Sequence, residues 1–179
     1  EVTFTENQYN QLTFSWSNGN GSKRAVFMKQ ASTGTASPEH NTTYTASSVF
    51  GSGTQIGTSG WYTVYNGAGS EVTVTALTAA TDYIIQVFEY NGVALGAEDY
   101  LLDTSTNNPN TVATYTPQTI YCNSSSGDDT TGDGSIETPY NTFHKGYTEA
   151  SPGDTINLTG TFDWTDAGES GDASTSGYT

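Results

Sequence analysis

The stretch Leu77-Thr78-Ala79-Ala80-Thr81-Asp82-Tyr83 carries the most information about the fold of this chain. A leucine ends one apolar segment, five small or polar residues follow, and a tyrosine begins the next segment. Ile85 and Val87 continue from Tyr83 at a period of two residues, which places these three side chains on one face of a β-strand. The stretch therefore predicts two strands joined by a short corner.

The sequence on either side of this corner consists of short apolar segments separated by turn residues. No long run with the 3.6-residue apolar period of a helix occurs before residue 138, so residues 1–116 are predicted to be all β. One segment, Arg24–Gln30, has apolar residues at consecutive positions, which predicts that both of its faces are covered. The predicted strands are Gln11–Trp16, Arg24–Gln30, Trp61–Tyr65, Glu71–Leu77, Tyr83–Tyr90 and Thr111–Tyr115.

The Leu77–Tyr83 pattern resembles the signature of fibronectin type III modules, in which a tyrosine six residues after a leucine opens a strand. The resemblance implies a β-sandwich in which the Tyr83 hydroxyl bonds to upstream backbone and the Trp16 ring is buried. Ala79 stands where the family usually has proline, and the region between Gln30 and Ser70 is longer than a standard module. We therefore expect an elaborated sandwich, similar to those in secreted multidomain proteins of Bacteroidetes-type bacteria.

A second unit is predicted to begin at Pro117, because proline cannot donate to a sheet ladder and marks a natural linker. Thr138-Pro139 predicts the N-cap and first position of a helix that ends at Ser151-Pro152-Gly153. The other predicted parts are a strand at Ile120–Cys122, a polar loop at Asn123–Ser135, a helical apolar face of Tyr140, Phe143, Tyr147 and Ala150, and a strand at Asp154–Thr159.

This order of strand, glycine- and aspartate-rich loop, short helix and strand is similar to the N-terminal start of pectate lyase-like right-handed parallel β-helices. The resemblance implies that the helix caps the open end of the solenoid, with Phe143 and Tyr147 as the covering side chains. A solenoid needs about three coils to bury a continuous core, so we expect this one to be truncated. The predicted fold class is all β, with a fibronectin type III-like β-sandwich over residues 1–116 and a β-helix cap and first coil over residues 117–179.

Composition restricts the partners that the chain can have. Nineteen acidic and four basic side chains give a formal net charge of −15, which predicts no nucleic-acid partner and repulsion from anionic membranes. No stretch approaches the roughly 20 apolar residues that span a bilayer, and Glu1–Asn10 lacks the features of a signal peptide. We expect a mature or excised part of a secreted or cell-surface protein, in which the acidity serves either solubility or cation binding.

Three aspartates in the loop of the second unit are candidate calcium ligands, because calcium prefers oxygen ligands in flexible loops. They are Asp128, Asp129 and Asp133. The spacing is not that of an EF-hand, since Thr131 replaces the middle acid and Tyr140 stands where the bidentate glutamate should be. Two interpretations remain: an irregular calcium site, or a turn in which the aspartates bond to neighbouring backbone amides.

Three aromatic residues in one predicted strand are candidate carbohydrate contacts, because aromatic rings present an apolar face to the C–H side of a sugar. Alternation predicts Trp61 and Tyr65 on one face and Tyr62 on the other. One of the two faces must belong to the core, so packing is the alternative role of these rings.

No catalytic residue is predicted, because neither His40 nor His144 has a metal-ligand or nucleophile–base spacing. We expect a non-catalytic module for adhesion, carbohydrate contact or spacing, with a polysaccharide or cell-surface glycan as partner and no required cofactor. One alternative is the front of a polysaccharide lyase whose catalytic residues lie beyond Thr179. A second alternative is a subunit of an extracellular fibre that self-associates through the open β-helix end.

Overall fold

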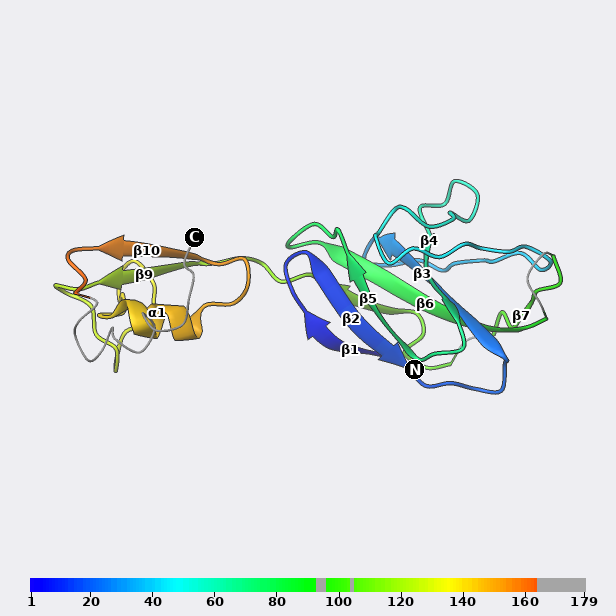
Figure 1. Cartoon of the computed structure of the whole chain (residues 1–179), viewed down its shortest axis with the longest axis horizontal. Coiled ribbons are helices and arrows are strands. Elements are labelled where there is room, and N and C mark those ends of the chain that lie inside the picture. The colour runs from blue at the N-terminus through cyan, green and yellow to red at the C-terminus, as the bar shows by residue number, and fades with distance from the viewer. Residues whose placement is uncertain (93–95, 104, 164–179) are drawn as a thin grey trace. The chain divides into compact units, whose positions relative to one another are not determined.

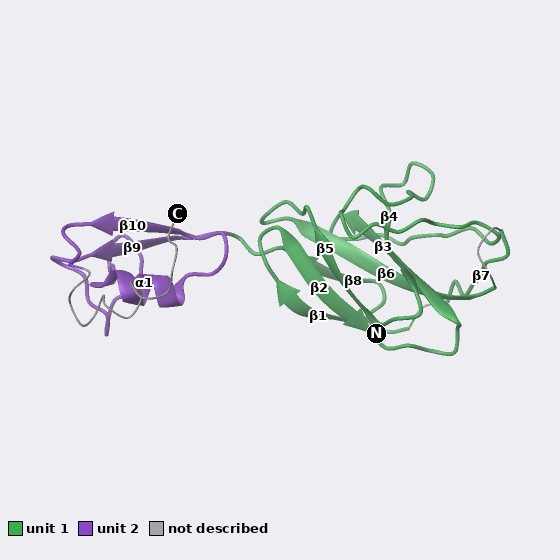
Figure 2. Cartoon of the chain, viewed as in Figure 1, with its two compact units in different colours: residues 1–116 green, residues 117–179 purple. Residues whose placement is uncertain are grey.

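The computed structural model describes residues 1–92, 96–103 and 105–163, and it is all β apart from one short helix (Figure 1). The chain divides into two compact units, unit 1 from Glu1 to Thr116 and unit 2 from Pro117 to Thr179 (Figure 2). No helix among the described residues has the length and apolar character needed to cross a membrane.

The described part of unit 1 is built from strands alone. Its strands are β1 (Val2–Asn7), β2 (Gln11–Trp16), β3 (Lys23–Gln30), β4 (Tyr62–Gly67), β5 (Glu71–Thr75), β6 (Asp82–Asn91), β7 (Asp99–Tyr100) and β8 (Asn110–Ala113). They form two antiparallel sheets, one in the order β1-β2-β5 and one in the order β4-β3-β6-β7, with β8 also pairing to β6.

The two sheets of unit 1 face each other across a sandwich core. Alternate residues of each strand point inward, as the two-residue period of a strand requires. Several of these, among them Leu12, Phe14 and Ile85, have no exposed surface. The buried members of the sandwich core are Val2, Leu12, Phe14, Trp16, Val26, Met28, Val64, Val74, Leu77, Tyr83, Ile85 and Val87. Unit 1 is therefore a β-sandwich.

The second sheet of unit 1 is covered on its outer face as well. Its outward side chains pack under the long connection between β3 and β4, which contributes Ala36, Tyr44 and Trp61. This outer core consists of Ala25, Phe27, Ala36, Tyr44, Trp61, Ile84, Phe88, Tyr90 and Tyr100. The prediction that both faces of β3 are covered is confirmed, and the long connection serves as a cover for the sheet.

The corner between β5 and β6 is held by a buried tyrosine. Tyr83 is 1% exposed, and its hydroxyl accepts a hydrogen bond of 3.0 Å from the backbone N–H of Thr78. The Thr114 hydroxyl spans the same corner, because it donates to the Thr78 carbonyl at 2.6 Å and accepts from the Thr81 amide at 3.0 Å. The predicted roles of the Tyr83 hydroxyl and ring are confirmed.

Unit 2 contains a parallel strand pair and one helix. The elements are β9 (Thr119–Asn123), α1 (Phe143–Glu149) and β10 (Thr155–Thr159). The strands pair in register, so Ile120 lies opposite Ile156 and Cys122 lies opposite Leu158. The core is small: its buried members are Ile120, Cys122 and Tyr140, with Ala150, Ile156 and Phe162 partly buried against them.

The predicted helix start at Thr138-Pro139 is wrong. The N-cap is Thr142, whose side chain accepts a hydrogen bond from the backbone N–H of Lys145. Tyr140 cannot be helical because its N–H donates to the Tyr121 carbonyl and its carbonyl accepts from Asn123, at 3.0 and 2.7 Å. This residue is an extended partner of β9 and does not belong to the helix.

The predicted covering side chains of α1 differ in their exposure. Phe143 is 8% exposed and lies inward, whereas Tyr147 is 46% exposed and stacks on Phe143 with 5.9 Å between ring centroids. The expected covering role of Tyr147 is therefore wrong in the described structure. A helix of two turns buries few residues, and the buried residues of α1 are Phe143 and Gly146.

Candidate functional site

The aromatic side chains of the β4 region lie in different places. Trp61 is 2% exposed in the outer core, so no ring face is available to a sugar and the predicted contact is wrong for this residue. Tyr65 packs against the sandwich core, on the opposite face of the sheet. The faces predicted by strict alternation are wrong because a bulge adds a residue to β4: Val26 pairs with Tyr65, and Phe27 pairs with Thr63.

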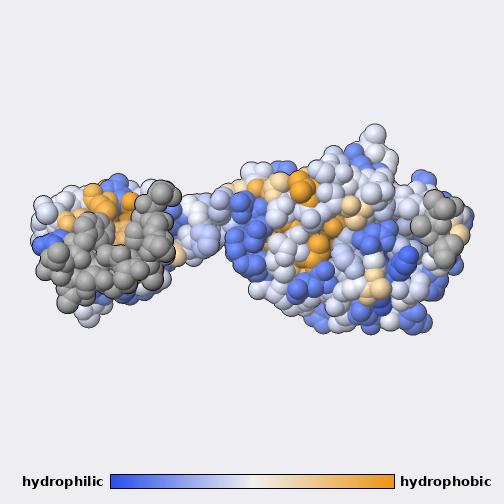
Figure 3. Space-filling view, viewed as in Figure 1, coloured by the Kyte–Doolittle hydropathy of each residue, from blue (hydrophilic) through white to orange (hydrophobic). Residues whose placement is uncertain are grey.

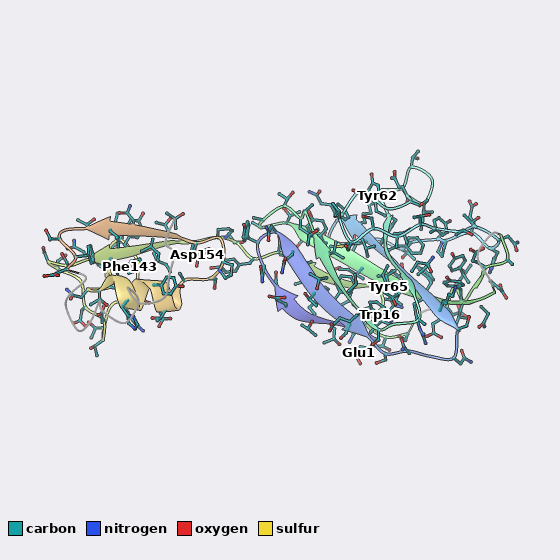
Figure 4. The ribbon with its side chains drawn as sticks, viewed as in Figure 1. Glu1, Trp16, Tyr62, Tyr65, Phe143 and Asp154 are labelled. Atoms are coloured by element: carbon teal, nitrogen blue, oxygen red, sulfur yellow. The ribbon has the colours of Figure 1, made fainter. Side chains whose placement is uncertain are left out.

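The rings of Tyr62 and Tyr65 are half-buried and are used in packing. Tyr62 meets Phe50 in a T-shaped contact with centroids 5.6 Å apart, and Tyr65 meets Trp16 in the same manner at 5.0 Å (Figure 4). The Tyr65 hydroxyl also accepts a 2.6 Å hydrogen bond from the Gly69 N–H. A carbohydrate role for Tyr62 and Tyr65 stays a prediction.

The three aspartates of the predicted calcium loop bond to nearby backbone and hydroxyl groups. Asp128 accepts from the amides of the second and third residues after it, and Asp133 accepts from Ser135 in the same way. Hydrogen bonds from the Thr138 hydroxyl, which has the larger effect, and from the Ser135 amide lower the pKa of Asp133 to about 2. This is the geometry of the turn interpretation, and no group of three or more His, Cys, Asp or Glu residues among residues 1–92, 96–103 and 105–163 is placed to hold a metal ion.

Asp129 differs from the other two aspartates, because it bonds to the residues at the start of α1. Its carboxylate accepts from the amides of Asn141 and Thr142 at 2.7 and 3.0 Å, and from the Thr142 hydroxyl at 2.7 Å. These bonds join the aspartate loop to the N-cap residue of the helix. The loop that was predicted to bind calcium therefore holds unit 2 together.

Glu98 is a buried carboxylate, 1% exposed, in the short segment before β7. It accepts from the Thr43 hydroxyl and from the Gly96 N–H, the latter at 3.1 Å. The Thr43 hydrogen bond, opposed by burial and helped by neighbouring backbone amides, holds the pKa of Glu98 below its ordinary value of 4.5. The carboxylate thus ties the long connection of unit 1 to the β6–β7 region.

We expect Glu98→Gln to destabilise unit 1 at neutral pH and to reduce its acid sensitivity. A carboxyl with a lowered folded-state pKa contributes stability above its unfolded pKa, and this contribution is lost as the pH falls through the folded value. Denaturant midpoints read by tryptophan fluorescence should therefore differ most near about pH 7 and converge below about pH 4. The exposed Glu39→Gln variant is the control; equal profiles for Glu98→Gln and Glu39→Gln would refute this role.

A cleft of about 320 Å³ opens at one end of unit 1. We call it the end cleft. Its lining comes from Glu1, the end of β2, the β2–β3 connection, β6 and the segment after β7. Trp16 and Val87 are buried and form its floor, whereas Leu101 is 52% exposed at its side. The exposed polar residues Asn18, Asn20 and Asp103 also line it.

The β2–β3 connection beside the end cleft is held by a charge pair. Buried Arg24 donates from Nε to Glu89 at 3.1 Å, and the amides of Gly19 and Gly21 donate to the same carboxylate. Burial raises the pKa of Glu89, but the Gly21, Gly19 and Arg24 hydrogen bonds outweigh it and the net shift is downward. A Cβ at either glycine would lie 2.7–2.8 Å from Glu89, so the close approach requires glycine at both positions.

One residue that lines the end cleft carries a buried donor without a partner. The indole Nε1 of Trp16 is the one buried side-chain nitrogen or oxygen atom among the described residues without a hydrogen-bond partner. Buried indole N–H groups usually find an acceptor, and leaving one without costs about 1–3 kcal/mol. Sequence reasoning assigned Trp16 to the core and missed the cleft, because the cleft depends on where the loops after β2 and β7 meet.

Unit 2 has an edge that nothing covers among the described residues. In β10, the Thr155 N–H and the Thr159 carbonyl bond toward the β9 side, so the backbone groups of Ile156 and Leu158 point to the opposite edge. Leu158 is 43% exposed although it lies in line with buried Cys122. Figure 3 shows apolar surface on unit 2 beside β10. We call this edge, with the Leu158 side chain, the open edge.

Comparison with known proteins finds distant structural similarity and no family. No family model and no curated protein matches the chain. Among solved structures, a computationally redesigned β-sandwich protein matches with a TM-score of 0.36 and 13% identity, over 64% of this chain and 86% of that one. The fibronectin type III domain of the human KIAA0970 protein matches with a TM-score of 0.30 and 14% identity, over 63% and 80%. Similarity at this level carries no conclusion about activity or ligand.

Proposed function

We propose that the chain is a non-catalytic structural and adhesive part of a secreted or cell-surface protein. In this proposal unit 1 is a fibronectin type III-like module that serves as spacer and glycan contact, and unit 2 is the N-terminal cap and first coil of a right-handed parallel β-helix. The open edge of β10 is the observation that carries the proposal, because it is suited to receive a further parallel strand.

The register of unit 2 supports a stacked arrangement. Ile120 and Ile156 form one apolar pair across the two strands, and Cys122 and Leu158 form the next. In a solenoid each coil repeats such pairs on its neighbour, so apolar side chains of a following strand would cover Leu158. The small core of unit 2 supports the same idea, because a core of this size contributes little stability without a neighbour.

Composition supports an extracellular location for unit 1 and unit 2. The net charge of −15 keeps the chain soluble and discourages association with polyanions. A compact sandwich whose loops are fixed by buried groups, such as Glu98 and the Arg24–Glu89 pair, suits a spacer that sets distance between binding parts.

We expect hydrogen exchange to show an alternating pattern in β10. The amides of Asn157 and Thr159, which face β9, should be protected in the 179-residue chain, whereas those of Ile156 and Leu158 should exchange at nearly unprotected rates. In a longer polypeptide that carries a following parallel strand, the latter two should slow by about a hundredfold. Fast exchange at Ile156 and Leu158 in both polypeptides would refute the β-helix proposal. Release of unsaturated sugar products by either polypeptide would refute the non-catalytic function.

The open edge also favours a second function, as a subunit of an extracellular fibre in which chains pair through β10. Self-association would then rise with concentration and would be blocked by Leu158→Lys, which places a charge on the open edge. Light scattering that shows only monomers over a wide concentration range would refute the fibre function and would leave the spacer function standing.

A further inference from the structure

We infer that the end cleft of unit 1 is a binding site for neutral, hydroxyl-rich glycans. The inference rests on the proposed adhesive function and names the ligand class and the residues that contact it. It concerns residues other than the three aromatic residues of the β4 region that the sequence suggested.

The lining of the end cleft combines an apolar part with polar groups that are not used elsewhere. The side chain of Leu101, which is 52% exposed, provides an apolar surface for the C–H face of a sugar, and the buried side chains of Trp16 and Val87 close the cleft beneath it. The side chains of Asn18 and Asn20 have no hydrogen-bond partner among the described residues and can both donate and accept. A ligand that matches both parts must itself offer an apolar face with donors and acceptors at its edge.

The unpartnered indole N–H of Trp16 supports a ligand with oxygen acceptors. Trp16 lines the end cleft, and its Nε1 atom is buried without an acceptor among the described residues. A sugar hydroxyl that reaches Nε1 through the floor of the cleft would supply one. Since pairing a buried polar group contributes more than pairing an exposed one, this contact should matter for affinity.

Charge selects neutral sugars over acidic ones. Glu89 is compensated by Arg24 and two backbone amides, and the Glu1 ammonium group, which also lines the cleft, donates to the Ser105 hydroxyl at 3.0 Å. The carboxylate of Asp103 is exposed at the cleft and has no cationic partner among the described residues. A carboxylate can accept hydrogen bonds from sugar hydroxyls, whereas it repels a uronic or sialic acid. The chain's net charge of −15 acts in the same direction.

The size and rigidity of the end cleft fit the end of a glycan. About 320 Å³ is at the small end of ligand pockets, which are roughly 300–1,000 Å³, and suits a terminal sugar or a short oligosaccharide. The Arg24–Glu89 pair and the two glycine amides fix the loop that carries Asn18 and Asn20. A loop that is already fixed loses less conformational entropy when a ligand binds.

The test is an NMR titration of the complete 179-residue chain. The probes are the methyl glycosides of glucose, galactose, mannose and N-acetylglucosamine, and an array of neutral oligosaccharides, compared with glucuronic and galacturonic acid. We expect at least one neutral probe to shift the Trp16 indole N–H resonance and to slow its exchange with water, while the acidic sugars have no effect.

Two variants locate the site. Asn18→Ala/Asn20→Ala changes only exposed side chains, and Trp16→Phe removes the indole donor but keeps an aromatic ring; each should weaken binding by roughly fivefold or more. Asn10→Ala, at the opposite end of β2, is the matched control and should bind as the unmodified chain does. Amide spectra establish that each variant is folded.

The inference is overturned if no neutral probe binds, if only the acidic sugars bind, or if binding is unchanged in Asn18→Ala/Asn20→Ala. These outcomes are separate from the test of the proposed function in unit 2, since the titration reports on unit 1 and the exchange pattern reports on β10. If no glycan binds the end cleft but the β10 amides are protected, the spacer function remains. If a glycan binds the end cleft but the β10 amides are unprotected, the adhesive function of unit 1 remains.

Discussion

Tyr83→Ala is expected to lower the free energy of unfolding of unit 1 by about 4 kcal/mol, which is a large part of the stability of an ordinary domain. The side chain is 1% exposed and its ring meets Phe50 in a T-shaped contact with centroids 5.1 Å apart. Removal of the ring leaves a cavity in the sandwich core and leaves the Thr78 N–H without its acceptor. The expected result is a large decrease in the denaturant midpoint.

Tyr83→Phe separates the two contributions. It keeps the ring and removes only the hydroxyl, so the loss should be about 1 kcal/mol. Tryptophan fluorescence follows unfolding of unit 1, because Trp16 and Trp61 both lie in its cores. Equal losses for Tyr83→Phe and Tyr83→Ala would mean that the hydroxyl alone holds the corner, and negligible losses for both would contradict its structural role.

The strands of the sandwich could be predicted where the side-chain pattern is strong. Gln11–Trp16 is predicted with its observed bounds, and the strand after the corner differs from β6 by one residue at each end. β1 and β7 were missed. In β1 the inner positions are only partly apolar, and β7 has two residues, so its pairing with the end of β6 depends on tertiary contacts rather than on a local pattern.

The residues at the candidate sites were harder to predict, because small local irregularities decide where side chains point. One bulge in β4 places Trp61 and Tyr65 on opposite faces of the sheet, and a sequence of alternating residues contains no signal for it. The end cleft was not predicted at all, since Asn18 and Asp103 are far apart in the sequence and meet only in the folded unit.

The start of the helix in unit 2 was also difficult to predict from the local sequence. Thr138-Pro139 is a good local start signal, yet Tyr140 pairs with the β9 backbone and the helix begins after Thr142. Asp129 contributes to the observed helix start, because its carboxylate accepts hydrogen bonds from the amide and the hydroxyl of Thr142. Tertiary hydrogen bonds therefore override the local preference.

Gly146→Ala is expected to destabilise unit 2 by about 2 kcal/mol, although alanine is the better helix former by roughly 1 kcal/mol. Gly146 is buried, and an added Cβ would lie 2.3 Å from Cys122 Sγ. The thiol belongs to β9, so relief requires rotation of the buried Cys122 side chain or movement of the helix or the strand. Steric overlap should outweigh helix propensity in a core as small as that of unit 2.

The single cysteine makes this prediction measurable. Cys122 is 1% exposed, so its rate of labelling by a thiol reagent in increasing denaturant reports opening of unit 2 alone, and Gly146→Ala should label faster by roughly thirtyfold. Cys122→Ala/Gly146→Ala should recover most of the loss, as judged by hydrogen exchange of the Asn123 amide. Thr148→Ala, at an exposed helix position, is the control for propensity. A Gly146→Ala chain that labels as slowly as the unmodified chain would show that α1 does not pack against β9 as described.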